Sequence, residues 1–308
     1  MSSPKLAREV SAFVRRVQMS RETSLFVIVE GRASDRPFYE RILRCSPKLA
    51  GKFQIVLAEQ VSISGVCAGG KPAALKLFQH LDERGSLRQA NASGDRTIVF
   101  MLDRDLDHVQ GVAETSPNVI YTRSSDVESE IIINADLIES TALSYGVTIE
   151  DIGFPERILN APRWIASEWE EWILLGILAG RAKARIGGRF RGIPKLLDGP
   201  NSELDMDAVE KVKNELIRAI GPAGVRQYEE VRTSLDGIFS SGSYWLLVKG
   251  RWMYEVIDRL VSETLRVPFQ KPSHAQFFTA CLGTVHFCGE SDWVRHYHGK
   301  LSGLGIAV

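Results

Sequence analysis

Short apolar runs alternate with amphipathic segments along the first 140 residues of the chain. The run Leu25–Val29 (LFVIV) ends at Glu30 and Gly31, and a helical pattern then begins at Asp35 and Pro37. A continuous apolar run that ends in a turn is typical of a strand buried on both faces. The alternation continues with strands predicted at 53–57, 97–102 and 118–121, and with helical faces formed by Phe38, Tyr39, Ile42 and Leu43, by Leu77, Phe78 and Leu81, and by Ile131, Ile132, Leu137 and Ile138. This order predicts an α/β domain over residues 1–140, with a parallel, doubly wound sheet flanked by helices.

The second half of the chain has the longer period of helices. Periodic segments joined by Gly, Pro and Ser predict a mostly helical domain over residues 141–308, with helices at 156–180, 206–220, 223–239 and 245–266. The tail from His274 onward is less regular and receives no assignment. At the N-terminus, apolar residues at helical spacing predict an amphipathic helix that starts at Ser3 and Pro4, which is not the pattern of a signal peptide.

Composition is that of a globular protein, with 44% hydrophobic and 25% charged residues, and it excludes disordered and low-complexity chains. The 38 basic residues balance 38 acidic ones, so any nucleic-acid contact must come from local clustering. Four scattered cysteines without a CxxC pair favour a reducing cytoplasm. The longest apolar stretch, 172–180, falls short of the ~20 residues of a membrane helix, so we expect no transmembrane segment and no membrane partner.

Acidic residues follow the predicted strands at the point where each one ends. Glu30 ends the first strand, Asp103, Asp105 and Asp107 follow the third, and Glu128 comes just after the fourth. Ligands of open α/β sheets collect at the carboxyl ends of the strands, and converging carboxylates repel one another unless a cation neutralises them. Mg²⁺ uses one or two carboxylates and keeps waters for a phosphate substrate, so this edge suits metal-dependent phosphoryl chemistry. Taken singly, each of these residues is as well explained as a loop former or a helix cap.

The combination resembles a known domain. A Glu-Gly turn after the first strand, followed by Asp-x-Asp-x-Asp after a later apolar strand, is similar to the TOPRIM domain of topoisomerases, primases and OLD-type nucleases. Four segments point to one family among the proteins that carry this domain; they are Val29–Tyr39 (VEGRASDRPFY), Gly69–Lys71, Leu102–Asp105 and Asp126–Glu128. These segments resemble the TOPRIM-like family that contains the nuclease subunit of the PARIS anti-phage defence system. The resemblance covers residues 25–132, and Lys249–Trp252 looks like a Lys-Gly element that the family carries in its helical region.

The resemblance implies a function and a set of roles. It implies a toxic nuclease that cleaves RNA such as tRNA, acts in the cytoplasm, and is controlled by an OLD-like ABC-type ATPase partner; a homodimer is kept open. Mg²⁺, or Mn²⁺ in its place, is the implied cofactor. The implied roles are base or metal ligand for Glu30, metal ligands for Asp103 and Asp105, and ligand of a second metal ion or supporting carboxylate for Glu128; Asp107 and Lys249 are further candidates. Asp35 matches a family position with a one-residue longer spacing and is equally well explained as the cap of the first helix.

Another motif supports an alternative function. Gly65–Lys71 satisfies G-x-x-x-x-G-K, and the apolar run before Asp103 satisfies the pattern of a Walker B strand, as in P-loop NTPases. Pro72 stands where the Mg²⁺-binding Ser or Thr would be, and no long buried strand precedes the loop. In the nuclease interpretation Lys71 and the backbone N–H groups at the helix start would hold a substrate phosphate. A plain glycine loop is the simpler explanation of the motif. For the whole chain, a non-catalytic module that binds nucleic acid or a partner ATPase is a further alternative.

Basic residues concentrate at 181–195, where no acidic residue occurs. Arg185, Arg189 and Arg191 are the candidates for phosphate contacts there, because arginine forks and flexible glycines suit the irregular backbone of RNA. A solvated loop or a docking surface for an acidic partner explains the same composition.

Two clusters of the second half favour structural roles. The cysteines and histidines near the tail match no standard zinc spacing, which favours core cysteines and surface histidines; they are Cys281, His286, Cys288, His296 and His298. The spacing of Trp164, Trp169 and Trp172 favours helix packing over base stacking.

Overall fold

The computed structural model describes residues 8–31, 34–66, 69–152, 155–184, 190, 197–198, 203–265 and 268–308. The chain divides into two compact units. The first consists of Met1–Asp103, Glu114–Arg123 and His286–Val308, and the second of Arg104–Ala113 and Ser124–Val285. The expected single boundary at residue 140 therefore differs from this division, because the chain passes between the units several times.

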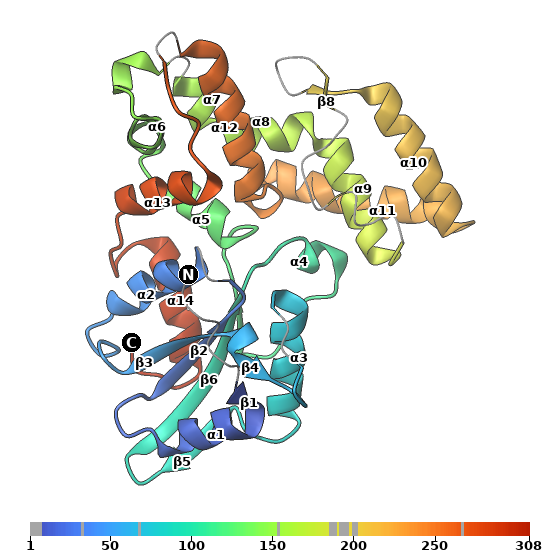
Figure 1. Cartoon of the computed structure of the whole chain (residues 1–308). Helices are drawn as coiled ribbons and strands as arrows, with labels where there is room; N and C mark the ends of the chain where they lie inside the picture. The colour runs from blue at the N-terminus through green and yellow to red at the C-terminus, as the bar shows by residue number, and fades with distance from the viewer. Residues whose placement is uncertain are drawn as a thin grey trace. The chain divides into compact units, whose positions relative to one another are not determined.

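A mixed sheet forms the centre of the first unit (Figure 1). The described residues form five strands, in the order β3-β2-β6-β5 with β7 also on β6: β2 (Leu25–Val29), β3 (Phe53–Leu57), β5 (Arg88–Asn91), β6 (Gly94–Leu102) and β7 (Val119–Tyr121). β2 pairs in parallel with both β3 and β6, and β7 is parallel to β6. β5 is antiparallel, so the expectation of an all-parallel sheet is wrong in this strand. Its sequence, RQAN, has no apolar run from which a strand could be predicted.

Helices flank the sheet, and the helix predicted to begin at Asp35 begins there. They are α1 (Val10–Met19), α2 (Asp35–Arg44), α3 (Lys71–Asp82) and α14 (Asp292–Gly303), with a short 3₁₀ turn at Ala58–Gln60. Phe13 of α1 packs edge-on against Phe26 of β2, and Phe78 of α3 packs in the same way on Phe100 of β6. Because Phe100 pairs in register with Ile28, these two helices cover the same face of the sheet.

Two expectations for the ends of the first unit need correction. The N-terminal helix begins at Val10, because β1 (Arg8–Glu9) is extended and pairs with β4 (Val61–Ser62); Ser3 and Pro4 lie outside the described residues. The tail left without assignment contains α14, whose Tyr297 packs on Phe38 and Tyr39 of α2. Aromatic and histidine residues, which fit strands and loops equally well, hide the helical period there.

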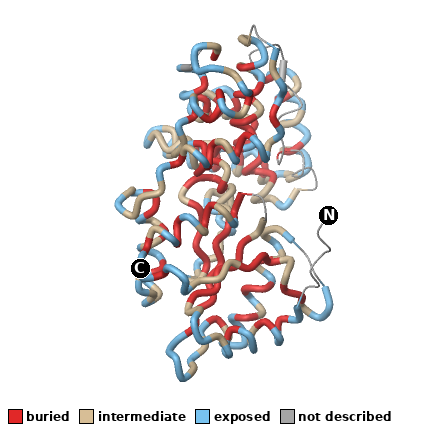
Figure 2. Tube along the Cα trace, turned by 60° about the vertical axis from the view of Figure 1, so that its left-hand side comes forward, coloured by how far each residue is buried: buried red, intermediate tan, exposed pale blue. Residues whose placement is uncertain are grey.

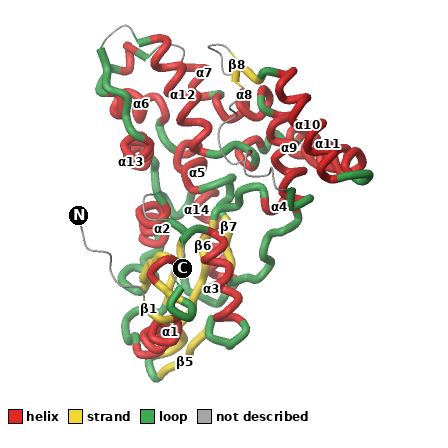
Figure 3. The backbone as a smooth tube through the Cα atoms, turned by 45° about the vertical axis from the view of Figure 1, so that its right-hand side comes forward, coloured by secondary structure: helices red, strands yellow, loops and turns green. Residues whose placement is uncertain are grey.

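The second unit is built of helices, apart from the short pair β8 (Leu197–Asp198) and β9 (Glu203–Leu204) (Figure 3). Its helices are α4 (Asp107–Gln110), α5 (Val127–Asn134), α6 (Leu137–Tyr145), α7 (Pro155–Leu159), α8 (Ala161–Glu168), α9 (Glu170–Arg181), α10 (Met206–Ile220), α11 (Gly224–Ser240), α12 (Gly250–Thr264) and α13 (His274–Thr284), with 3₁₀ turns at Ile149–Asp151 and Tyr244–Leu246.

Several predicted helices are divided in the structure. The segment 156–180 forms three helices, and the one predicted after Asp126 ends at Asn134 because Asp136 caps a new helix by accepting the N–H of Glu139. The segment 245–266 becomes helical only at Gly250. Local caps end these helices, whereas hydrophobic periodicity continues through them.

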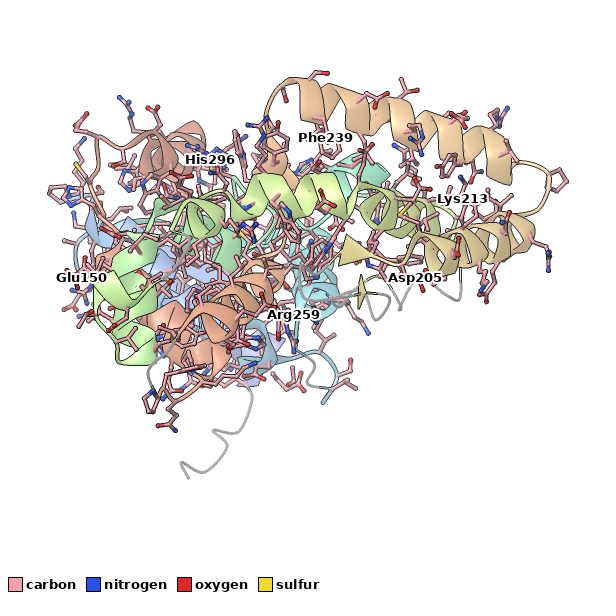
Figure 4. The ribbon with its side chains drawn as sticks, turned by 90° about the horizontal axis from the view of Figure 1, so that it is seen from above. Glu150, Asp205, Lys213, Phe239, Arg259 and His296 are labelled. Atoms are coloured by element: carbon pink, nitrogen blue, oxygen red, sulfur yellow. The ribbon has the colours of Figure 1, made fainter. Side chains whose placement is uncertain are left out.

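Buried residues lie in the interior of each unit (Figure 2). In the second unit Trp169 packs on Trp252 and Trp172 on Phe190, which confirms helix packing for these two tryptophans. Lys213 of α10, labelled in Figure 4, lies 3.7 Å from Glu171 of α9 and 4.4 Å from the ring centroid of Tyr228.

Among the helices of the described ranges, none has both the length and the apolar character needed to cross a bilayer.

Truncation of the β6 core should destabilise the protein. Phe100 is fully buried and packs against Phe78, so Phe100→Ala leaves a cavity and should lower the free energy of unfolding by about 3–5 kcal/mol. Urea unfolding measures this change. Leu143→Ala, at a side chain that is 62% exposed, is the control and should change stability little. An equal effect of both variants would contradict the assigned core.

Candidate active site at the carboxyl ends of β2 and β6

The first two predicted carboxylates meet where two adjacent strands end. β2 and β6 are parallel with Val29 opposite Met101, so Glu30 and Asp103 leave the sheet at the same edge. The Asp103 N–H donates to Glu30 Oε1 at 3.0 Å, and both residues are half-buried. The sheet therefore brings together two candidates that are 73 residues apart in the chain.

Asp35 closes the turn that carries Glu30. It is 6% exposed, its Oδ2 accepts the Gly31 N–H at 2.7 Å, and the Ser34 hydroxyl donates to its Oδ1 at 3.3 Å. Burial raises the pKa of Asp35, and the hydrogen bonds from Gly31 and Ser34 oppose that rise. The side chain thus reaches back to Gly31 and fixes the start of the Glu30 turn.

Tyr39 is a site residue that the sequence pattern placed only on the buried face of a helix. Its hydroxyl is fully buried and has no hydrogen-bond partner within the described part of the chain. Burial raises the pKa of Tyr39 well above its usual value, and Tyr297, Asp103, Asp35 and Glu30 raise it further. The phenol therefore stays protonated near three carboxylates and keeps a donor available. Its position one helical turn after Asp35 was the one signal that linked it to this edge.

Lys71 lies at the same end of the sheet. It follows Gly70, whose positive φ of 77° suits glycine, and starts α3. Its ammonium lies 5.6 Å from the ring centroid of Tyr121, and Tyr121 pairs in register with Leu102, the residue before Asp103. A cation beside this acidic edge suits the binding of a phosphate group.

The P-loop alternative lacks its strand. A P-loop joins a central strand of the sheet to a helix. Here the segment before the loop is β4, which has two residues and pairs with β1 outside the five-stranded sheet. Cys67 and Ala68 of the motif lie outside the described residues. The geometry of β4 disfavours a nucleotide site at this loop.

Asp105 belongs to the second unit and has a cationic partner there. Lys249 Nζ lies 2.7 Å from Asp105 Oδ1, with the two side chains 22% and 31% exposed. Asp105 has a positive φ of 48°, and its N–H donates to the Ser125 carbonyl at 2.6 Å. Lys249, a further candidate from the sequence, is therefore held beside Asp105 within the second unit.

Asp126 docks the Lys249–Gly250 turn on the start of α5. Its Oδ1 accepts the Ser129 N–H at 2.7 Å, the Ser129 hydroxyl at 2.6 Å and the Gly250 N–H at 3.0 Å. Burial raises the pKa of Asp126, and these hydrogen bonds, together with the charge of Lys249, lower it. A Cβ on Gly250 would collide with the Glu128 side chain, so the contact requires glycine.

The predicted carboxylates divide between the two units. Glu30 and Asp103 lie in the first, whereas Asp105, Asp107 and Glu128 lie in the second, with Asp107 at the start of α4 and Glu128 in the first turn of α5. Within the described ranges, no group of three or more His, Cys, Asp or Glu side chains is placed to hold a metal ion. The donor set of Glu30 and Asp103 nevertheless fits Mg²⁺, which needs only one or two carboxylates.

Comparison with known proteins adds no assignment. No family model, no curated protein and no solved structure matches the chain. The functional conclusion therefore depends on the residues described above.

Of the basic segment 181–195, the structure describes residues 181–184 and Phe190. Arg185, Arg189 and Arg191 lie outside the described residues. Arg181 donates through Nη2 to the Val109 carbonyl at 2.7 Å and through Nε at 3.1 Å. Arg181 thus ties α9 to the α4 segment within the second unit.

The cysteines and histidines of the tail serve the backbone and the core. Cys281 is fully buried, and burial raises its pKa to about 12. His298 Nε2 lies 2.9 Å from the Ile42 carbonyl, and His296 Nε2, labelled in Figure 4, lies 3.2 Å from the Tyr121 carbonyl. These two contacts join α14 to α2 and to β7 within the first unit.

Substitution of Gly250 should disrupt the docking of α12. Gly250→Ala places a methyl group against Glu128 and Ser129, so the melting temperature should fall by several degrees. Gly237→Ala in α11 is the matched control, because its Cβ would meet nothing within 4 Å and alanine favours a helix interior. A Gly250→Ala protein as stable as the control would contradict the docking contact.

The buried Asp35 should make stability depend on pH. Because its pKa is raised in the folded state, the unfolded chain ionises first as pH rises from about 4, so the wild type loses stability over the pH range above that value. The substitution Asp35→Asn removes this pH-dependent loss of stability. The stability of the variant relative to wild type should therefore be greater at pH 7 than at pH 4. Urea unfolding at both pH values measures the change.

Leu143→Ala, at an exposed side chain that carries no titratable group, is the control and should show the same difference from wild type at both pH values. A relative stability of Asp35→Asn that falls between pH 4 and pH 7 would contradict the raised pKa.

Proposed function

We propose that this chain is a Mg²⁺-dependent nuclease of the TOPRIM type that hydrolyses phosphodiester bonds, with RNA such as tRNA as the favoured substrate. The observation that carries the proposal is the meeting of Glu30 and Asp103 at the ends of two adjacent parallel strands, joined by the Asp103 N–H. The resemblance of residues 25–132 to TOPRIM-like defence nucleases supports the same function.

Glu30 and Asp103 would hold the metal ion. Bound Mg²⁺, or Mn²⁺ in its place, would polarise the scissile phosphate and lower the pKa of a water. Asp35 keeps Glu30 in place through Gly31, and the protonated Tyr39 hydroxyl lies near these carboxylates as an unused hydrogen-bond donor among the described residues. Lys71 would bind a phosphate oxygen of the strand at the same edge.

The other predicted ligands stay predictions from the resemblance. Asp105, Asp107 and Glu128 lie in the second unit, and the ammonium of Lys249 accompanies Asp105 there. The basic residues Arg185, Arg189 and Arg191 are proposed to bind the substrate backbone. The resemblance also supports a cytoplasmic toxin of an anti-phage system under control of an ABC-type ATPase subunit.

Loss of Glu30 should abolish cleavage without unfolding the protein. Glu30→Gln keeps an acceptor for the Asp103 N–H but removes the charge that a metal ligand needs. Its rate of tRNA cleavage in Mg²⁺ should fall at least about 100-fold, because a metal ion supplies several kcal/mol of charge stabilisation. Gel analysis of end-labelled tRNA and of plasmid DNA, with Mg²⁺ or EDTA, measures the rate and identifies the substrate.

Glu22→Gln is the matched control, because Glu22 is exposed and precedes β2 at the opposite end of the strand. It should cleave as the wild type does. Full activity of folded Glu30→Gln would overturn the site. Retention of RNA without cleavage, even with the ATPase partner present, would replace the nuclease with a binding module.

A further inference from the structure

A cavity lies at the end of the sheet opposite to Glu30 and Asp103. It has a volume of ≈ 610 Å³, and α1, the turn that follows it and the starts of β2 and β3 line it. Three arginines of its lining, Arg8, Arg15 and Arg16, share the cavity with the hydroxyls of Ser20 and Thr23. The volume is in the range of small-molecule sites, which bury most of the surface of a compact ligand.

The arginines of the cavity have no acidic partner. The lining contains no carboxylate, and none of the three guanidinium groups forms an ion pair within the described part of the chain. The carboxylate of the neighbouring Glu9 contacts other groups: its Oε1 accepts the Ser62 hydroxyl at 3.0 Å and the Gly65 N–H at 2.6 Å.

The three arginines are exposed, and the charge of Arg8 acts on Arg16. Arg16 Nη2 donates to Gln54 Oε1 at 2.9 Å, which holds it over the start of β3. Burial and the charge of Arg8 lower the pKa of Arg16. Like charges gathered without a counter-ion repel one another, and an anion bound between them would relieve that repulsion.

We propose that this cavity binds the phosphate groups of a nucleotide. A guanidinium group presents N–H donors in a planar fork that matches two phosphate oxygens, and three such groups suit a diphosphate or triphosphate. Thr23 and Ser20 add hydroxyls at the rim, and Ala12 and Met19 add apolar surface for the rest of the ligand. The three arginines line one cavity, which favours a ligand with adjacent phosphate groups over an extended strand.

This site is separate from the proposed active site. Thr23 precedes β2 and Glu30 follows it, and a strand of five residues spans about 17 Å. A nucleotide bound at the arginines would therefore not contact Glu30. The proposal does not depend on nuclease activity.

Isothermal titration calorimetry of the full chain, without added metal, tests the proposal with three probes: ATP, AMP and inorganic pyrophosphate. ATP and pyrophosphate should bind and compete with each other, and AMP should bind at least about tenfold more weakly. The variant Arg8→Ala/Arg15→Ala/Arg16→Ala should lower the affinity for ATP at least about 30-fold, because it removes the charge-assisted hydrogen bonds to the phosphates. The single substitution Arg15→Glu, on an exposed side chain, should give a loss in the same direction.

The variant Lys48→Ala/Lys52→Ala/Arg84→Ala is the matched control. It removes the same charge from exposed positions of the first unit that do not line the cavity, and it should keep the affinity for ATP within about twofold. Glu30→Gln should bind ATP as the wild type does, which separates this site from the proposed reaction. Unchanged ATP binding by the arginine variant, an equal loss in the control, or binding of single-stranded RNA without binding of pyrophosphate would overturn the proposal.

Discussion

The parallel pairing of β2 with β6 is the constraint on which the rest of the first unit depends. Both strands are buried along their shared length, so their register is fixed by the core and not by the polar residues that follow them. A shift by one residue would turn the buried side chains of β2 to the other face. The position of Glu30 beside the backbone of Asp103 is thus a consequence of hydrophobic burial: the buried strands fix where the polar residues that follow them lie.

The grouping of acidic side chains at the ends of β2 and β6 costs folding free energy. Glu30, Asp35 and Asp103 gather negative charge around a buried phenol, and burial works against ionisation of Asp35. The fold offsets part of that cost with backbone N–H groups, which donate to Glu30 and to Asp35. In the second unit the same problem is solved differently, since the ammonium of Lys249 accompanies Asp105 and three donors surround Asp126.

Elements that depend on the hydrophobic pattern can be predicted from the sequence, whereas features that depend on single polar contacts cannot. The bounds of β2 and β3 and the first turn of α2 follow from apolar runs and from Asp35. The strand β5 could not be predicted, because it is polar and exists only through its pairing with β6. In the candidate site, Glu30 and Asp103 were found from their places after strands. Tyr39 was not, because the pattern shows that a residue is buried but not which polar groups surround its hydroxyl.

The position of α14 in the chain has a consequence for biosynthesis. This helix packs its Tyr297 on Phe38 and Tyr39, next to the Glu30 turn, yet the ribosome makes it only after the whole second unit. A nascent chain that has completed β6 and β7 still lacks this aromatic support beneath its acidic edge. The order of translation therefore delays the aromatic packing beside this edge until the second unit has been synthesised.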